Sequence, residues 1–344
     1  MSSNTPTPTN NLPNPLKGDA FLDKALRPLI WEEYIGQTNI KDNLKILLGA
    51  AKGSNHPPEH LLFYGPPGLG KTTLAYLIAS ELGAQIKATS GPAIEKVGDL
   101  ASIITNLEPG DILFIDEIHR LNKMIEEVLY PAMEQGSLNI IIGKGPGARV
   151  IQLELPPFTL IAATTRIALL SSPLRSRFSG GTHRLEFYSE KEIGEIIKRS
   201  SKILNIEIED GAVAEIAKRS RFTPRTANQL LKRARDYAEV ANLPLNQETV
   251  TKALTLLGID VLGLSGADRA VLEIIANKFK GGPVGLSTVA TAMSEEEATV
   301  EEVYEPYLIQ CGFIERTPRG RTLTDRGYEH LGQKIPANRQ NKLI

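Results

Sequence analysis

The sequence contains a single cysteine and no long apolar run, and these two scarcities limit what the chain can be. One cysteine, Cys311, excludes a disulfide-stapled framework, and its place in an apolar helical stretch leads us to expect it buried. No apolar stretch approaches the roughly 18 residues of a membrane span. Residues 1–17 are polar and proline-rich without the apolar core of a signal peptide. We therefore expect a cytoplasmic protein in a reducing compartment, with a disordered tail over residues 1–19.

Net charge is also almost absent. The chain has 39 Lys and Arg against 40 Asp and Glu, a formal net charge of −1. This balance neither demands nor excludes a nucleic-acid ligand, so only a local basic patch would indicate one. At 344 residues the chain is too long for one small core and is expected to form two or three domains.

The most informative stretch is LLFYGPPGLGKTT at residues 61–73. A short apolar run enters a glycine-rich turn, and Lys71, Thr72 and Thr73 then open a helical pattern. This is the P-loop spacing in its strand–turn–helix setting. Backbone N–H groups around Gly68 and Gly70 would point at phosphate oxygens, while Lys71 reaches the terminal phosphates and Thr72 offers a hydroxyl to Mg²⁺. A chance match to the spacing is the alternative, but the flanking strand and helix favour a nucleoside triphosphate site.

An acidic pair, Asp116-Glu117, ends a later apolar strand in DILFIDEIHR. In P-loop enzymes the first acid of such a pair holds the Mg²⁺ shell, and the second can accept a proton from the attacking water. The alternative is an ordinary solvated loop after a strand. Together with the P-loop, the pair predicts hydrolysis of the bound nucleoside triphosphate. We assign no role to His119, since a histidine there more commonly packs in the core or supports another side chain of the site.

Short apolar strands alternate with helical patterns over residues 20–187. The runs HLLFYG, QIKATS, DILFIDE and FTLIAATTR are typical of parallel strands covered on both faces, so we expect a large α/β P-loop domain. Two β-type runs around Gly143–Gly147 predict a hairpin between Glu134 and Leu155. This hairpin is either an edge packed on the core or an arm that docks a partner. Its alternating aliphatic residues are Ile140, Ile142, Ile151 and Leu153.

Residues 188–260 lose the strand signal and are expected to form a small all-helical lid domain. Ser189 and Glu192 form a capping box ahead of an amphipathic helix. Thr223-Pro224 places an N-cap before a proline at the first helical position. A further helix is expected from Asn246 to Leu257.

Residues 261–335 are expected to form a third domain with the element order of a winged helix. Helices are predicted over Asp268–Phe279, Leu286–Met293 and about Glu297–Cys311, followed by a hairpin in FIERTPRGRTLT. Winged helices bind DNA or proteins. Residues 336–344 remain as a C-terminal tail.

Charge placement in this third domain favours the hairpin over the third helix as a DNA contact. The helix is acidic and would repel phosphates, whereas the hairpin carries Arg316, Arg319 and Arg321. Such a wing would contact the DNA backbone with little sequence readout. A solvated basic hairpin without a ligand is the alternative. The acidic residues at the helix are Glu295, Glu296, Glu297, Glu301, Glu302 and Glu305.

Many stretches together resemble the RuvB family of AAA+ ATPases, the motors of Holliday-junction branch migration. They include LRPLIWEEYIGQ, HLLFYGPPGLGKTTLA, TSGPAIEKVGDL, NLEPGDILFIDEIHRL, EEVLYPAME, PPFTLIAATTR, SPLRSRF and RLEFY. TPRTANQLLKRARDYAEV, KFKGGPVGL and EPYLIQCGFIERTPRGR continue in the family's order. The similarity runs from about Leu22 to Gly332 and covers almost the whole chain.

The resemblance implies a set of nucleotide contacts. Thr165 would be the sensor near the γ-phosphate, Arg177 the finger that reaches a neighbouring subunit's ATP, and Arg225 the second sensor, on the lid. Mg²⁺ would be held by Thr72 and Asp116. The implied catalytic residues are Lys71, Asp116, Glu117, Thr165, Arg177 and Arg225. The implied nucleotide contacts are Leu26, Arg27, Gly68, Gly70, Lys71, Thr72, Thr73, Glu134, Gln135, Gly136, Arg177, Tyr188 and Arg225.

The resemblance also implies partners. Arg316 and Arg321 match the wing's DNA contacts, and the hairpin around Ile151 and Leu153 matches the arm that docks on RuvA. Because Arg177 would act in trans, the active form would be a closed ring, by resemblance a homo-hexamer. Such a ring would translocate duplex DNA at four-way junctions with RuvA and RuvC, in recombination, DNA repair and the SOS response.

Several positions depart from the family's pattern. Ser176 stands where an aspartate is usual, and the loop over residues 179–182 is longer, which would alter the setting of Arg177. Phe222 replaces the small residue that precedes TPR, and Glu297 stands where the family often has a DNA-contacting arginine. None of these changes removes a catalytic group.

Two other functions compete with a branch-migration motor. A sliding-clamp loader is another DNA-handling AAA+ ATPase, but the winged helix and the long hairpin argue against it. A nucleotide-gated DNA-binding scaffold would bind ATP without turnover. The intact Lys71, Asp116, Glu117 and Arg177 argue against that second alternative.

Overall fold

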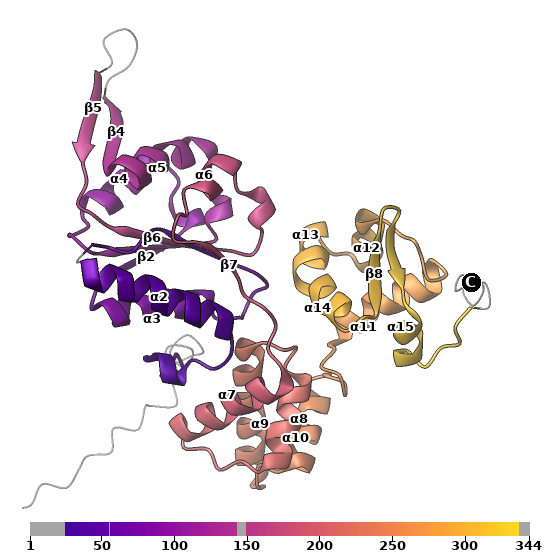
Figure 1. Cartoon of the computed structure of the whole chain (residues 1–344). Coiled ribbons are helices and arrows are strands. Elements are labelled where there is room, and N and C mark those ends of the chain that lie inside the picture. The colour runs from indigo at the N-terminus through magenta and orange to yellow at the C-terminus, as the bar shows by residue number, and fades with distance from the viewer. Residues whose placement is uncertain (1–24, 55, 143–148, 337–344) are drawn as a thin grey trace, which may run out of the picture.

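The computed structural model describes residues 25–54, 56–142 and 149–336. Three bodies follow one another along the chain: a mixed α/β body, a small helical body and a C-terminal body with a two-stranded sheet (Figure 1). The predicted N-terminal tail, the Gly143–Gly147 turn and nearly all of the 336–344 tail lie outside the described residues. In the part that is described, no helix is long and apolar enough to cross a membrane.

A five-stranded parallel sheet organises the first body, in the order β2-β3-β6-β1-β7. Its strands are β1 (Leu61–Tyr64), β2 (Ile86–Ser90), β3 (Ile112–Asp116), β6 (Thr159–Thr164) and β7 (Thr182–Arg184). The four apolar runs picked out in the sequence form four of these strands, which confirms the α/β prediction. The sequence did not predict β7, because its three residues, Thr-His-Arg, carry no apolar signal and pair only with β1 at the edge.

Helices cover both faces of the sheet because its strands alternate apolar side chains between two cores. Leu61 and Phe63 pack with α2 and α3, whereas Leu62 packs with α4, α5 and α6. These helices are α2 (Thr38–Ser54), α3 (Lys71–Leu82), α4 (Val97–Thr105), α5 (Lys123–Gln135) and α6 (Ser172–Ser176). Short 3₁₀ turns are η1 (Trp31–Glu33), η2 (Gly91–Ala93), η3 (Ile118–Arg120) and η5 (Ile167–Leu169). The P-loop and the ends of β3 and β6 thereby meet at one edge of a rigid sheet.

The predicted hairpin is confirmed as β4 (Ser137–Ile142) and β5 (Arg149–Glu154), an antiparallel pair that projects from the first body (Figure 1). Leu138 is buried and Leu153 packs against the same core, so the base of the hairpin is anchored. Ile151, paired with Ile140, is 43% exposed. The side chains of Ile140 and Ile142 lie outside the described part. The hairpin is therefore an anchored edge at its base and solvent-facing at Ile151.

The second body is the predicted all-helical lid. Its helices are α7 (Glu190–Ile203), α8 (Asp210–Arg219), α9 (Pro224–Ala241) and α10 (Gln247–Leu256). The predicted caps are formed: Ser189 and Glu192 exchange their capping-box bonds, and the Thr223 hydroxyl accepts from the Thr226 N–H at 3.3 Å. Buried lid residues join the α2–α3 core through Tyr34 and Tyr188, so lid and sheet share a continuous apolar contact.

The third body is the predicted winged helix, with its own core that includes the buried Cys311. Its helical segments are α11 (Gly266–Glu273), η6 (Ile274–Lys278), α12 (Leu286–Met293), α13 (Glu297–Thr299), η7 (Val300–Tyr304), α14 (Glu305–Gln310) and α15 (Asp325–His330). The wing strands are β8 (Ile314–Thr317) and β9 (Gly320–Leu323). Segments α13, η7 and α14 run on without a break and form the acidic third helix.

Candidate nucleotide site

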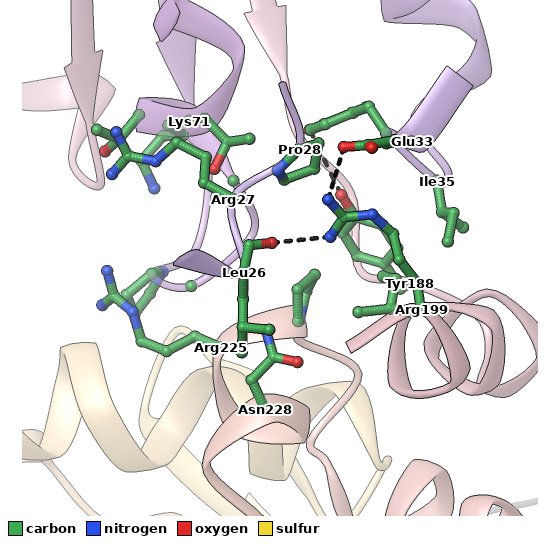
Figure 2. Close-up of a pocket in the computed structure, with 18 of the residues that line it drawn as sticks. Leu26, Arg27, Pro28, Glu33, Ile35, Lys71, Tyr188, Arg199, Arg225 and Asn228 are labelled. Carbon is green, nitrogen blue, oxygen red and sulfur yellow. Dashed lines mark hydrogen bonds and ion pairs between the residues drawn. The ribbon is translucent and has the colours of Figure 1, made fainter. Parts of the chain in front are cut away.

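A pocket of about 320 Å³ lies where the P-loop, the segment around residues 26–35 and the lid meet (Figure 2). Twelve of the predicted site residues line it: Leu26, Arg27, Gly68, Gly70, Lys71, Thr72, Thr73, Asp116, Glu117, Thr165, Tyr188 and Arg225. They come from six separate stretches of chain, at residues 26–27, 68–73, 116–117, 165, 188 and 225, and from two bodies. Folding therefore brings residues that lie far apart in the sequence into one pocket.

The P-loop glycines are required by backbone shape and by crowding. Gly68 has φ +81° and Gly70 has φ +99°, a region that L side chains rarely adopt. A Cβ on Gly68 would lie 3.1 Å from Arg225 Cβ, and one on Gly70 would lie 3.1 Å from the Tyr34 hydroxyl. The loop consequently turns tightly against the lid and opens directly into α3 at Lys71, with the helix N-terminus at the pocket.

Lys71 is held inside the loop with 8% of its surface exposed. Its Nζ donates to the carbonyl oxygens of Gly65 at 2.8 Å and Pro66 at 2.9 Å. Burial lowers the pKa of Lys71 to about 8, with the charge of Asp116 opposing this shift and that of Arg225 adding to it. An anionic phosphate beside this ammonium would relieve the cost of burying it. The site is thus built to receive negative charge.

Thr72 and Asp116 form the inner polar wall. The Thr72 hydroxyl lies 3.4 Å from Asp116 Oδ2, and Asp116 Oδ1 accepts from the Glu117 N–H at 2.9 Å. The described residues contain no cluster of three or more His, Cys, Asp or Glu that would hold a metal by themselves. A hydroxyl and one carboxylate nevertheless suit Mg²⁺, which keeps waters and takes substrate phosphates as its other ligands.

Glu117 follows β3 in a left-handed conformation, with φ 49°. This is unusual for a residue with a side chain, and such backbone strain is found preferentially at functional sites. The residue lines the pocket, and its Oε2 lies 3.4 Å from Arg120 NH1 in a half-exposed ion pair. The left-handed backbone therefore places the Glu117 carboxylate at the pocket. The Arg120 guanidinium that pairs with this carboxylate is half-exposed, so water can replace it.

The end of β6 adds Thr165 to the pocket, while its neighbour Thr164 is fully buried. The Thr164 hydroxyl lies 2.9 Å from His119 Nδ1 and accepts from the Arg166 N–H at 3.0 Å. Burial lowers the pKa of His119, which favours the neutral ring. His119 thus supports the strand that carries Thr165, in agreement with the packing role expected for it.

Tyrosines close the junction between sheet and lid. The Tyr188 hydroxyl donates to the Leu69 carbonyl at 3.2 Å and lies 3.4 Å from the Tyr34 hydroxyl. Burial raises the pKa of Tyr188 to about 12, so the phenol stays neutral. On the lid, the Arg225 N–H donates to the Gly68 carbonyl at 3.4 Å. The lid is therefore bonded to the P-loop itself.

Sequence reasoning missed Arg199, which fixes the outer wall of the pocket. Its guanidinium donates to the Leu26 carbonyl at 2.8 Å and pairs with Glu33 at 2.7 Å (Figure 2). A charged residue on an amphipathic helix has the pattern of a solvated face, so the sequence held no signal for this role. The other unpredicted lining residues are Pro28, Glu33, Tyr34, Ile35, Pro67, Ile196, Pro224 and Asn228.

Four predicted nucleotide contacts lie outside this pocket: Glu134, Gln135, Gly136 and Arg177. Arg177 NH2 instead pairs with Glu134 Oε1 at 3.2 Å. Glu134, Gln135 and Gly136 lie at the end of α5, away from the pocket of their own chain, so a nucleotide contact there stays a prediction and would have to be made to a neighbouring subunit's nucleotide. The role of Arg177 toward a neighbouring subunit likewise stays a prediction.

The wing arginines are also not free in the way that the sequence suggested. Arg316 and Arg321 both pair with the carboxylate of Glu305, whose side chain is 1% exposed. Arg316 and Arg166 both reach Glu301, and Arg166 also reaches Glu302, which ties the third helix to the first body. The acidic third helix thus forms ion pairs with arginine side chains of its own chain. Arg319, at the wing tip, is exposed.

Comparison with known proteins agrees with the geometry. Models of three domain families match in order: the Holliday junction DNA helicase RuvB P-loop domain over residues 26–185, the RuvB AAA lid domain over 188–260 and the RuvB C-terminal winged helix domain over 261–332. The chain is 55% identical over 319 residues to the Holliday junction branch migration complex subunit RuvB of Chloroflexus aggregans, covering 92% of this chain and 91% of that protein.

Solved structures of a RuvB protein also match this chain. The RuvB Holliday junction branch migration motor of Thermotoga maritima is 50% identical, with a TM-score of 0.83, and the match covers 91% of this chain and all of that one. A mutant of the same T. maritima protein matches with a TM-score of 0.84 over 90% of this chain and 99% of that chain. The chain therefore belongs to the RuvB family of AAA+ ATPases.

Proposed function

We propose that this chain binds and hydrolyses Mg²⁺·ATP in the pocket between P-loop and lid, and uses the energy to drive Holliday-junction branch migration. One observation carries the proposal: Lys71, Thr72, Asp116 and Glu117 of the sheet body line the same pocket as Arg225 of the lid. A site shared by two bodies converts phosphate chemistry into relative motion of those bodies. We divide the chain accordingly into an ATPase domain over 20–187, a lid over 188–260 and a winged-helix head over 261–335.

Each residue of the inner wall has a role in the proposed reaction. Lys71 and the P-loop N–H groups would hold the terminal phosphates, and Thr72 with Asp116 would hold Mg²⁺, which supplies positive charge to those phosphates. Glu117 would accept the proton of the attacking water, and Thr165 would orient that water. Gly68, Gly70 and Thr73 would complete the phosphate cradle.

The outer wall would receive the base. Leu26, Arg27 and Tyr188 would line the adenine end, with Arg199 fixing the Leu26 backbone in place. Arg225 would report the γ-phosphate to the lid. Because its N–H is bonded to Gly68, a change in the loop would be transmitted to α9.

Arg177 would complete the site of the next subunit. It does not line its own pocket, and an arginine placed on the developing charge contributes about 10³–10⁵ in rate in phosphoryl-transfer enzymes. Each subunit would then need a neighbour, which favours a closed homo-hexameric ring around duplex DNA. The wing would touch the DNA backbone, the β4–β5 hairpin would dock RuvA, and RuvC would act on the same junction.

A mixing experiment tests the shared site. Arg177→Ala subunits and Lys71→Ala subunits should each be inactive, but mixed rings should hydrolyse ATP where an intact P-loop meets an intact finger. Absence of restored activity at every ratio, with co-assembly confirmed by sedimentation, would overturn the ring. Migration of synthetic four-way junctions with RuvA separates this function from clamp loading, and DNA-stimulated phosphate release separates it from a non-hydrolysing scaffold.

A further inference from the structure

The Arg177 guanidinium makes specific contacts with three other residues. Its guanidinium carbon lies 4.2 Å from the centroid of the Tyr130 ring, and NH1 donates to the Pro173 carbonyl at 2.6 Å. NH2 pairs with Glu134 at 3.2 Å, and the side chain is 19% exposed. The Nε of Arg177 is buried without a hydrogen-bond partner among the described residues. One face and two nitrogens of the guanidinium are thus held by these contacts.

The Tyr130 ring is itself held from behind. The Ser171 hydroxyl donates its only proton to Glu126 Oε2 at 2.6 Å, so the Tyr130 hydroxyl donates to Ser171 Oγ at 3.0 Å. The Tyr130 hydroxyl also lies 3.5 Å from the same oxygen of Glu126, which is 4% exposed. Ser171 in turn caps α6, the helix that ends at Arg177. A buried carboxylate therefore ties the ring and the helix of the finger together.

Spacing along α5 explains how one helix does this. Glu126, Tyr130 and Glu134 recur every four residues and so lie on one helix face. Glu126 is buried and is bonded to Ser171, the cap of α6. The ring of Tyr130 packs against the Arg177 guanidinium, and the exposed Glu134 pairs with that guanidinium. Successive turns of α5 therefore provide a buried carboxylate that supports α6 and an exposed carboxylate that another anion can replace.

The backbone beyond the finger is also tied down, although its sequence departs from the family. The Ser176 hydroxyl donates to the Pro173 carbonyl at 2.9 Å, and the Gly180 N–H donates to the His60 carbonyl at 2.9 Å. A Cβ on Gly180 would lie 2.7 Å from the Glu59 carbonyl oxygen, so this position requires glycine. The backbone of the longer loop is therefore held in place, and contacts from α5 determine where the Arg177 side chain lies.

We propose that Tyr130 is a positioning residue for Arg177, and that Glu134 holds the guanidinium until a phosphate oxygen of the next subunit's nucleotide replaces it. This inference rests on the proposed function in trans. The aromatic face fixes the plane in which the guanidinium is presented, and arginine, unlike lysine, depends on such a plane to meet phosphate oxygens in parallel. The Glu134 carboxylate is 52% exposed, so a multiply charged phosphate in a closed interface competes with it successfully.

The mixed ring allows a test in which each chain has one task. The donor chain carries Lys71→Ala and supplies only the finger, and the acceptor chain carries Arg177→Ala and supplies only the nucleotide pocket. Adding Tyr130→Leu to the donor should lower the restored kcat by about tenfold and leave nucleotide affinity unchanged, since the bound nucleotide sits in the other chain. The same substitution in the acceptor should leave the restored rate as it was, because that finger is already absent.

Conservative variants separate positioning from general packing. Tyr130→Phe in the donor keeps the ring face and should recover most of the rate. Glu134→Gln in the donor removes the resting anion from a surface position and should raise the restored rate, but not when Tyr130→Leu is also present. Equal losses from Tyr130→Leu in donor and acceptor, or an unchanged rate with Tyr130→Leu in the donor, would overturn the inference. Failure of the parent mixture to regain activity would instead overturn the trans site on which it rests.

Discussion

The guanidinium of Arg321 lies against the carboxylate of Glu305, with contacts of 2.9 and 3.0 Å between a side chain that is 16% exposed and one that is 1% exposed. Arg316 makes a second pair with the same carboxylate while remaining 50% exposed. An arginine chosen from sequence as a DNA contact is thus also the counter-charge of a buried acid. The two roles predict different consequences for the three wing arginines.

Arg321→Ala should destabilise the winged-helix domain as well as weaken DNA binding. The substitution leaves the buried Glu305 with one partner fewer, at a cost of roughly 1–3 kcal/mol. Arg319→Ala is the matched control, since Arg319 is exposed at the wing tip: it should leave thermal unfolding unchanged and reduce the salt slope of duplex binding by about 0.9. Equal melting temperatures for the two variants would contradict the structural role of Arg321.

Acid should loosen the same domain. Burial raises the pKa of Glu305, but hydrogen bonds from Arg316 and Arg321 outweigh it and the net pKa is lowered. A carboxyl whose pKa is lower in the folded state stabilises the fold above its unfolded pKa of about 4.3, and that stabilisation is lost as pH falls through the folded value. Melting curves from pH 7 to pH 3 should fall more steeply for the wild type than for Glu305→Gln. Parallel curves would exclude Glu305 as the group responsible.

These wing contacts show which parts of the molecule the sequence predicted and which it did not. The P-loop, Asp116-Glu117 and the capped lid helices were predictable because their signals are local: a glycine spacing, an apolar strand ending in acids, a serine before a helix. In the sequence Glu305 stands only as one of six acids that would repel phosphates, because nothing near it in sequence shows that its turn of helix faces inward toward the wing.

The same limit applies around the nucleotide pocket. Arg199 meets Leu26, and Tyr130 meets Ser171, across separations at which periodicity carries no information. The resemblance to a family supplied Thr165, Arg177 and Arg225 as candidates, but it could not supply the side chains that hold them. Those contacts depend on packing between elements, which a single sequence does not record.

Nucleotide binding should take up a proton at alkaline pH. The pKa of Lys71 in the free protein is about 8, so the side chain is largely neutral at pH 9, whereas a bound phosphate would restore its charge. Calorimetry with a Mg²⁺-bound non-hydrolysable ATP analogue, in buffers of different ionisation enthalpy, should show uptake approaching one proton at pH 9 and close to none at pH 7. The bound Mg²⁺ favours the ionised phosphates over this range, which limits their contribution to the proton count. The same proton count at both pH values would rule out Lys71 as the proton acceptor.

Glu117→Gln should bind ATP normally and lose hydrolysis by about 10²–10⁴, because an amide cannot accept the proton of the attacking water. Arg120 supplies the control, since it pairs with Glu117 at 3.4 Å in a half-exposed ion pair. Arg120→Ala should change the rate by no more than about threefold, as pairs of this exposure contribute little. The measurement is steady-state phosphate release with duplex DNA and RuvA, alongside binding of a fluorescent nucleotide. Comparable rates for wild type and Glu117→Gln would remove Glu117 from the reaction.

Phe222 joins the lid turn to the winged-helix head in a conformation that suits glycine. Its φ is +56°, and its ring packs against Tyr307 of the head at 6.0 Å and against Phe187 at 6.5 Å. The neighbouring Arg221, also at φ +56°, pairs with the fully buried Asp268 of the head at 3.2 Å. The left-handed backbone costs roughly 1–2 kcal/mol, and the aromatic contacts across the junction offset it.

Two substitutions at Phe222 separate these effects. Phe222→Gly removes both the backbone strain and the ring, so the melting temperature should stay close to that of the wild type while the head loosens from the lid. Phe222→Leu keeps the strain and loses the aromatic contacts, so it should be less stable than Phe222→Gly by about 1 kcal/mol. Hydrogen exchange at residues 258–264, the link into the head, should increase in both variants, because both lose the contact with Tyr307. A Phe222→Gly protein with unchanged exchange there would show that Arg221 and Asp268 hold the head without help from the ring.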